Sequence, residues 1–216
     1  MKHKAVLFDL DGTLLDTLED LADSMNAALS SLGLPPHPMA DYRIFVGDGV
    51  EQLGRRVLPK DRPDEQLARR VVAAMRQEYG RRWDRKTRPY EGIPQLLDAL
   101  SKRGIALAIL SNKPEDFVQM LVSKFLPAGA FAAVRGQRAG SSRKPDPAQA
   151  LDISQALGAA PAEFVFLGDT NTDMRTAASA GMHPVGALWG FRSARELSES
   201  GARDLISRPE ELLRFF

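Results

Sequence analysis

The feature that most constrains the fold is an apolar run near the start of the chain that ends in two acids. Residues 5–8 read Ala-Val-Leu-Phe, and Asp9, Asp11, Gly12 and Thr13 follow them. Such a run predicts a strand that is buried on both faces. Carboxylates at the end of a buried strand are costly unless a cation compensates their charge. Since Asp and Gly are also common in turns, these residues alone favour a metal site and an ordinary polar turn equally.

Along the rest of the chain the secondary-structure pattern changes once. Residues 16–87 show helical periodicity only, whereas short apolar runs such as 105–110 and 164–167 alternate with helical patterns from there onward. This alternation predicts a doubly wound parallel sheet. The predicted fold class is therefore α/β, with a Rossmann-like core made of 1–15 and 88–216 and an inserted α-helical cap domain over 16–87. Because the insert leaves directly after the acidic loop, we expect it to cover that loop as a lid.

Composition restricts the partners. The 216 residues are 44% hydrophobic and 26% charged with a net charge of +1, so neither nucleic acid nor an anionic membrane is indicated as a partner. The absence of cysteine excludes disulfides, thiol nucleophiles and cysteine-based metal sites. The start superficially resembles a signal peptide, but Asp9 and Asp11 cut its apolar region short. We expect a cytoplasmic protein, either a monomer or a homodimer.

Polar residues follow three of the predicted strands, and a fourth loop adds a lysine. In open α/β sheets ligands bind at the carboxyl ends of strands, so these groups should gather there. Carboxylates without a Cys or His cluster favour Mg²⁺ over zinc. Lysine, hydroxyls and helix N-termini favour a phosphate. The combination indicates phosphoryl transfer to an aspartate. The groups are Asp9, Asp11 and Thr13; Ser111 and Asn112; Lys144; and Asp169, Asn171 and Asp173.

Each group also has a simpler interpretation. Ser111 and Asn112 are suited to cap the following helix, Asp169 and Asp173 to form a turn and an N-cap, and Lys144 to lie on the surface. These interpretations do not explain why all the groups fall on one edge of the sheet. The three histidines share no spacing typical of a metal site or a triad, and we interpret them as incidental: His3, His37 and His183.

Taken in order, these residues make the chain resemble the haloacid dehalogenase-like hydrolase superfamily. Residues 9–13, Ser111-Asn112, Lys144-Pro145 and 168–173 are similar to its four motifs. The helical insert resembles the superfamily's α-helical cap of the first type. The resemblance implies that Asp9 attacks phosphorus and forms an aspartyl-phosphate. Asp11 would protonate the leaving oxygen and then activate the hydrolytic water.

The resemblance also implies how ligands are held. Mg²⁺ would be bound by Asp9, the backbone carbonyl of Asp11 and Asp169, with Asp173 in support. Lys144 would neutralise charge in the transition state. The remaining motif residues would bind the phosphoryl oxygens: Gly12, Thr13, Ser111 and the backbone of Asn112.

Asp11 implies phosphate-ester chemistry, because the dehalogenases and phosphonate hydrolases of the superfamily lack an acid there. Within that branch the chain looks most like phosphoglycolate phosphatases, on residues 46–50, 89–93 and 187–190. The small phosphorylated metabolite implied is then 2-phosphoglycolate. Other sugar-phosphate phosphatases, a pyrophosphatase and β-phosphoglucomutase-like mutases belong to the same branch. A non-catalytic ligand-binding module stays open as a further alternative.

The cap carries further expectations. Gly47, Asp48 and Gly49 are expected to select the substrate, and Asp48 with Glu51 has the spacing of a capping box. Three basic residues are candidates for binding a substrate carboxylate, namely Arg43, Arg55 and Lys60. We expect the cap to move by bending near 15–16 and 87–89.

Overall fold

The computed structural model describes residues 3–59 and 63–216, and within them a parallel sheet forms the core. Its six strands follow the order β5-β4-β1-β6-β7-β8, and every neighbouring pair is parallel. The predicted doubly wound α/β fold is therefore confirmed. The strands are β1 (Ala5–Phe8), β4 (Ala106–Pro114), β5 (Ala133–Gln137), β6 (Phe164–Gly168), β7 (His183–Ala187) and β8 (Asp204–Ile206).

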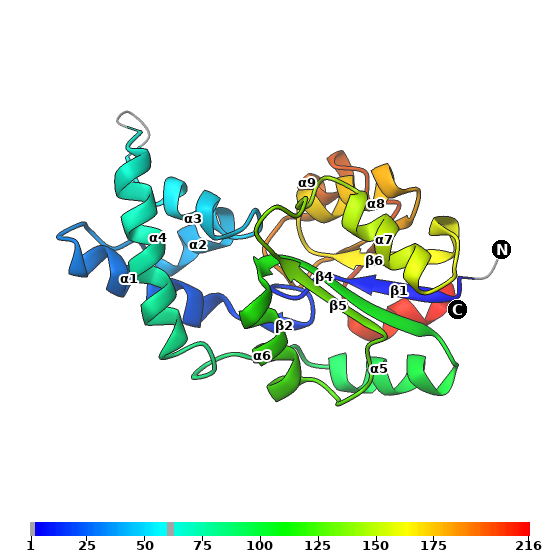
Figure 1. Cartoon of the computed structure of the whole chain (residues 1–216). Helices are drawn as coiled ribbons and strands as arrows, with labels where there is room; N and C mark the ends of the chain where they lie inside the picture. Colours follow the sequence, from blue (N-terminus) through cyan, green and yellow to red (C-terminus); the bar gives the residue numbers. More distant parts are fainter. Residues whose placement is uncertain (1–2, 60–62) are drawn as a thin grey trace.

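Helices cover both faces of this sheet (Figure 1). Val6 and Phe8 of β1 pack among the residues of α5, α6 and the 3-10 helix η2, whereas Ala5 and Leu7 pack among those of α7 and α8. The first strand is thus buried on both faces, as its apolar run predicted. The helices of the core are α5 (Ile93–Lys102), α6 (Glu115–Phe125), α7 (Ala148–Ala156), η1 (Pro161–Glu163), α8 (Asn171–Ala180), α9 (Ala194–Glu199) and η2 (Pro209–Phe215).

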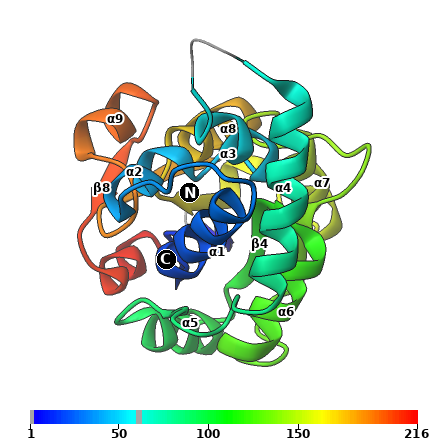
Figure 2. The same cartoon turned by 90° about the vertical axis from the view of Figure 1, so that its left-hand side faces the viewer.

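Four helices between β1 and β4 form a separate apolar cluster at one end of the sheet, at the left in Figure 1 and facing the viewer in Figure 2. Met25 of α1 and Val71 and Met75 of α4 are buried at its centre. We retain 16–87 as our proposal for the cap domain. These helices are α1 (Leu18–Ser31), α2 (Met39–Phe45), α3 (Val50–Arg56) and α4 (Glu65–Gly80).

The two chain segments that join this cluster to the sheet pair with each other. β2 (Leu15–Asp16) and β3 (Arg88–Pro89) form an antiparallel two-stranded ribbon, which the sequence did not predict. The Asp20 carboxylate accepts hydrogen bonds from Lys86 N and Thr87 N, and so ties α1 to the returning segment. The predicted bending at these segments stays a prediction.

Several local predictions are wrong. The prolines at positions 35, 36 and 38 predict that the first helix does not resume there. The structure nevertheless forms α2 directly after Pro38, because a proline just before the first turn lacks only an N–H that the helix does not use. The capping box of Asp48 and Glu51 does not form: Gly49 is the N-cap of α3 and no side chain caps it. The sequence predicts a short helix over 174–180 and a terminal helix from Pro209 onward. In the structure α8 begins earlier, at Asn171, and the terminal element η2 is a 3-10 helix.

None of the helices within the described residues has the length and apolar character needed to cross a membrane.

Candidate active site

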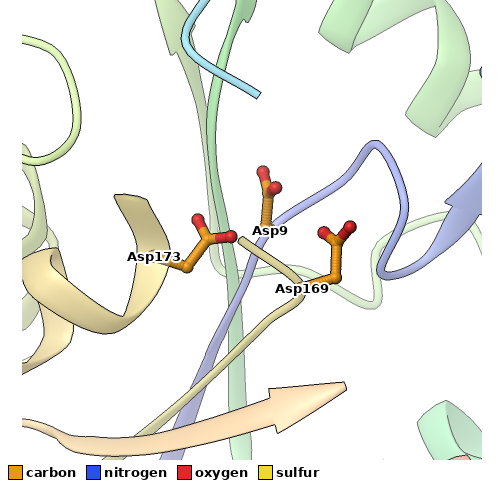
Figure 3. Close-up of side chains that lie close together, drawn as sticks. All are labelled: Asp9, Asp169 and Asp173. Carbon is orange, nitrogen blue, oxygen red and sulfur yellow. The ribbon is translucent and has the colours of Figure 1, made fainter. Parts of the chain in front are cut away.

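Three of the predicted acids meet at the carboxyl edge of the sheet (Figure 3). Asp9 follows β1, Asp169 follows β6, and Asp173 lies in the first turn of α8. One carboxylate oxygen of each lies within 4.8 Å of the others, and all three residues are buried. The strand order explains this meeting, because β1 and β6 are neighbours whose ends coincide in register.

The electrostatics of this cluster favour a bound cation. Burial, and then the charge of Asp173, raise the pKa of Asp9 to about 7, although Lys144 opposes the shift. Burial, and then the charges of Asp9 and Asp173, raise the pKa of Asp169 well above its usual value. Buried carboxylates that repel one another resist ionisation, and a divalent cation removes that resistance. The three oxygen donors therefore fit a hard metal ion.

Lys144 lies beside the same acids. Its Nζ is 2.8 Å from Asp9 Oδ1 and 2.6 Å from Asp173 Oδ1, and its side chain is buried. Burial alone would lower the pKa of Lys144, but the charges of Asp173 and Asp9 raise it above its usual value. A permanently cationic ammonium thus touches the carboxylate predicted to be the nucleophile.

The carboxylate of Asp11 faces a different environment. It is outside the cluster of three acids, although Asp9 and Asp11 line the same cavity. Thr17 Oγ1 donates to Asp11 Oδ1 at 2.7 Å, and Lys113 Nζ lies 3.0 and 3.2 Å from the two carboxylate oxygens. Two acids one residue apart are therefore held by different partners.

Lys113 is the main site residue that the sequence analysis missed. It is 6% exposed, and its ammonium lies 4.6 Å from the centroid of the Tyr79 ring, in the cap. Burial would lower the pKa of Lys113, but Asp11 and Tyr79 raise it. The available signal was its place directly after Ser111-Asn112, at the end of a predicted strand.

Asn112 holds two loops together through its side chain. Its Oδ1 accepts from Lys144 N at 2.9 Å, and its Nδ2 donates to Lys144 O at 3.0 Å and to Gly47 O at 3.3 Å. Ser111 Oγ accepts from Lys113 N at 3.2 Å and lines the cavity. The simpler interpretation of this pair as a helix cap is wrong, because the N-cap of α6 is Pro114 and no side chain caps that helix.

Gly12 and Thr13 both adjoin Asp169. Gly12 has φ +86°, and a Cβ there would lie 2.3 Å from Asp169 Oδ2, so the close approach requires glycine. Thr13 is fully buried, and its Oγ1 donates to Asp169 Oδ1 at 2.9 Å. Phe191 N donates to the other oxygen, Oδ2, at 2.8 Å. In this structure the two residues orient an acid, and their contact with a phosphate stays a prediction.

The cap closes the site from the other side. A cavity of about 600 Å³, including its opening to solvent, lies between the acids and the cap, with Gly47 and Gly49 in its wall. Asp48 is absent from that wall: Thr172 Oγ1 donates to it and Arg56 pairs with it. Burial would raise the pKa of Asp48, but these contacts hold it below its usual value.

The cap residues considered for a carboxylate lie elsewhere. Arg43 donates to Gly190 O at 3.0 Å, and Arg55 pairs with Glu65 on the surface. Lys60 lies outside the described residues. The three histidines are also outside the wall of the cavity, in agreement with their interpretation as incidental: His3, His37 and His183.

The fold and this site define a class of α/β protein that collects buried acids and a lysine at the carboxyl edge of a parallel sheet, beneath an inserted helical cap. The family described as haloacid dehalogenase-like hydrolase matches residues 6–187, and the chain belongs to that family.

The similarity to known proteins covers nearly the whole chain. A phosphoglycolate phosphatase of Pseudomonas putida is 34% identical over 97% of this chain and 78% of its own length. A phosphoglycolate phosphatase of Aquifex aeolicus is 32% identical over 98% of this chain and 95% of its own length. The crystal structure of a protein from Lactobacillus delbrueckii subsp. bulgaricus superposes on this one with a TM-score of 0.91, over 98% of this chain and 97% of that chain. The sequences of the two proteins are 33% identical.

Proposed function

We propose that this protein is a Mg²⁺-dependent phosphatase that hydrolyses a small phosphomonoester, with 2-phosphoglycolate as its first substrate. The observation that carries the proposal is the separation of two neighbouring acids. Asp9 lies in a buried acid cluster with Lys144, whereas Asp11 faces the same cavity from outside that cluster. The names of the relatives in Pseudomonas putida and Aquifex aeolicus support the choice of substrate.

In this proposal Asp9 is the nucleophile. Its carboxylate attacks phosphorus and forms an aspartyl-phosphate, while Asp11 donates a proton to the leaving oxygen. Asp11 then accepts a proton from the water that hydrolyses the aspartyl-phosphate. Lys144, fixed 2.8 Å from Asp9 Oδ1, stabilises the charge that develops on the phosphoryl group.

The acids that fit a metal ion are Asp9, Asp169 and Asp173, and the backbone carbonyl of Asp11 would complete the protein ligands. Mg²⁺ bound there would supply positive charge to the phosphoryl oxygens. Asp173 also forms the capping box of α8, where Thr170 N donates to its Oδ2 at 3.0 Å. The N-cap itself is Thr170, so the interpretation of Asp173 as the N-cap is wrong, and Asp173 contributes to the capping box from inside the first turn.

Phosphate binding is assigned to Gly12, Thr13, Ser111, Asn112 and Lys144. Gly47, Asp48 and Gly49 are the proposed specificity segment; Asp48 would act by fixing the loop, since it faces Thr172 rather than the cavity. A cytoplasmic location and a monomeric or homodimeric state stay predictions.

A phosphate-release screen over small phosphoesters with Mg²⁺ tests the proposal. We expect release that EDTA abolishes and that Asp9→Asn lowers by about 10⁴-fold or more. The control is Asp152→Asn, an exposed carboxylate on α7. Retained release in Asp9→Asn would contradict the covalent mechanism. An isomerised phosphoester with little free phosphate would instead indicate a mutase. Absence of turnover on every phosphoester would indicate a non-catalytic binding module.

A further inference from the structure

The wall of the cavity beyond the acids has few charged groups. Apart from Asp9 and Asp11, the charged residues that line it are Lys113 and Arg76. Most of the remaining wall is apolar, and consists of Leu21, Val46, Val50, Leu53, Met75, Pro114 and Phe117. An anionic group on the leaving part of a substrate would be unpaired against such a wall, at a high cost in free energy. Within the described residues, the cations of the wall that could pair with it are these two.

Arg76 is already engaged near the surface. Its guanidinium donates to Asp116 Oδ2 at 2.9 Å and lies 5.8 Å from the centroid of the Phe117 ring. Both members of the Arg76–Asp116 pair are about half exposed, at 45% and 57%. Arg76 is thus held at the rim by an ion pair, whereas Lys113 lies deep in the cavity beside Asp11.

Lys113 retains capacity for a ligand. A lysine ammonium has three N–H donors. The hydrogen bonds that the structure gives to Nζ both go to Asp11, at 3.0 and 3.2 Å. The third donor makes no further side-chain hydrogen bond among the described residues, although the Tyr79 hydroxyl is near enough to raise the pKa of Lys113, so an acceptor in the cavity can meet both groups.

Tyr79 provides a second, independent observation. It is 1% exposed and lines the cavity, and its hydroxyl has no hydrogen-bond partner among the residues that the structure describes. Leaving a buried hydroxyl unpaired costs free energy, so such groups in folded proteins nearly always have a partner. A hydroxyl beside an ammonium, both facing one cavity, is suited to an anionic acceptor.

We propose that Lys113 and Tyr79 form the subsite that binds the carboxylate of a short phosphorylated carboxylic acid, and so determine which phosphoester the site accepts. The proposal rests on the phosphatase function proposed above and names the residues that select its substrate class. Neither residue belongs to the glycine-containing loop of residues 47–49 in which the sequence placed selection.

The position of Asp11 limits the length of that acid. Asp11 contacts Lys113 at 3.0 Å, and a general acid must come within about 3 Å of the oxygen that it protonates. The leaving oxygen therefore lies within roughly 6 Å of the Lys113 ammonium. A carboxylate one carbon away from the ester oxygen reaches the ammonium, whereas one at the end of a longer chain would extend beyond it.

A pair of matched substrates tests the subsite. We compare kcat/KM for 2-phosphoglycolate with that for 2-phosphoglycolamide, which has the same shape but no negative carboxylate. In Lys113→Met the ratio of the two values should fall by about 30- to 100-fold, the effect of losing a charged hydrogen bond. Most of the loss should appear in KM for the acid. Lys113→Arg should restore part of the ratio, and Tyr79→Phe should lower it by about fivefold.

The same ratio excludes a purely structural role. If Lys113 only positions Asp11, then Lys113→Met lowers kcat equally for the acid and the amide and leaves their ratio unchanged, which would overturn the proposal. If Arg76→Met instead lowered kcat/KM selectively for the acid, the carboxylate would bind at Arg76 on the rim, and the proposal would be wrong. Lys102→Met, an exposed lysine on α5, is the control and should change neither value.

A binding measurement keeps the proposal testable without turnover. Calorimetry compares the affinity of Asp9→Asn and of Asp9→Asn/Lys113→Met for 2-phosphoglycolate in the presence of Mg²⁺. We expect the double variant to bind at least 30-fold more weakly, and equal affinities would contradict the subsite. A wild-type enzyme that releases phosphate equally well from the acid and the amide would also contradict it, while leaving the phosphatase function intact. Absence of release from every phosphoester would instead contradict the phosphatase function.

Discussion

The two sides of the cavity differ in kind. The floor consists of loops at the carboxyl edge of one parallel sheet, with Asp9, Asp11 and Lys113 in the wall and Lys144 beside Asp9. The roof consists mainly of helices with apolar side chains, together with the Tyr79 hydroxyl and, at the rim, Arg76. In the proposed function the charged groups of the floor are the nucleophile, the general acid and the metal ligands, which the reaction needs at fixed positions. The roof is apolar because it excludes water and selects a shape. We therefore expect changes to the acids of the floor to affect every substrate, whereas changes in the roof, and at Lys113 where the floor meets Tyr79 of the roof, should affect only some.

After the loss expected for Asp9→Asn, the largest effect within this comparison should come from Asp11, with a size that depends on the leaving group. Asp11→Asn removes the proposed general acid, so we expect kcat for 2-phosphoglycolate to fall by about 10²- to 10⁴-fold. A nitrophenyl ester has a leaving oxygen that needs no proton, and its formation of aspartyl-phosphate should lose far less. Single-turnover kinetics on both substrates measures this difference. Equal losses on both would show that Asp11 acts in some other way.

A smaller effect concerns the stability of the floor without metal. The pKa of Asp9 is raised from 3.8 to about 7 in the folded chain, so the folded state holds a proton that the unfolded state has released across this range. Stability of the metal-free protein should consequently fall as pH rises from about 4 to 7, and Mg²⁺ should raise Tm most at the upper end. Calorimetric scans with and without the ion measure both trends.

The matched variants sharpen this test. Asp9→Asn should weaken the pH dependence of Tm in the metal-free protein, because it removes one of the two acids whose pKa is raised, the other being Asp169. Asp152→Asn, an exposed acid on α7, should leave it as it is. A wild-type Tm that is indifferent to Mg²⁺ at pH 7 would count against the metal site.

The smallest expected effect lies where roof and floor touch. Arg192 of the core donates to Val46 O at 2.7 Å and to Ile44 O at 3.2 Å in the cap. Arg192→Gln should loosen the closed position of the cap and raise KM severalfold for every substrate, with a loss of stability of about 1 kcal/mol. Steady-state kinetics and a melting curve measure the two effects. Arg195→Gln is the control, since Arg195 is exposed and pairs with Glu199 on the surface. Equal changes in both variants would refute the role of the Arg192 contact.

The sequence analysis was most successful where structure is local. The apolar strand, the alternation of strands with helices and the polar residues after each strand all follow from short stretches of chain. Prediction from the sequence failed where residues far apart in the chain compete for the same partner. Asp48 and Glu51 have the spacing of a capping box, but Arg56 and Thr172 bind Asp48 instead. The prolines before α2 suggested a loop, although the cap packs Tyr42 into its core.

The sequence alone thus determined the edge of the sheet at which the acids gather. The reason is geometric, because the carboxyl ends of parallel strands meet on one side whatever the rest of the chain does. Only the tertiary structure decided which side chain pairs with each charged group of the site. Lys113 is one of 29 lysines and arginines, and nothing in its neighbourhood along the chain shows that it meets Asp11 from one side and Tyr79 from another. That meeting requires the cap to pack against the core, and side-chain pairing of this kind is a property of the folded chain.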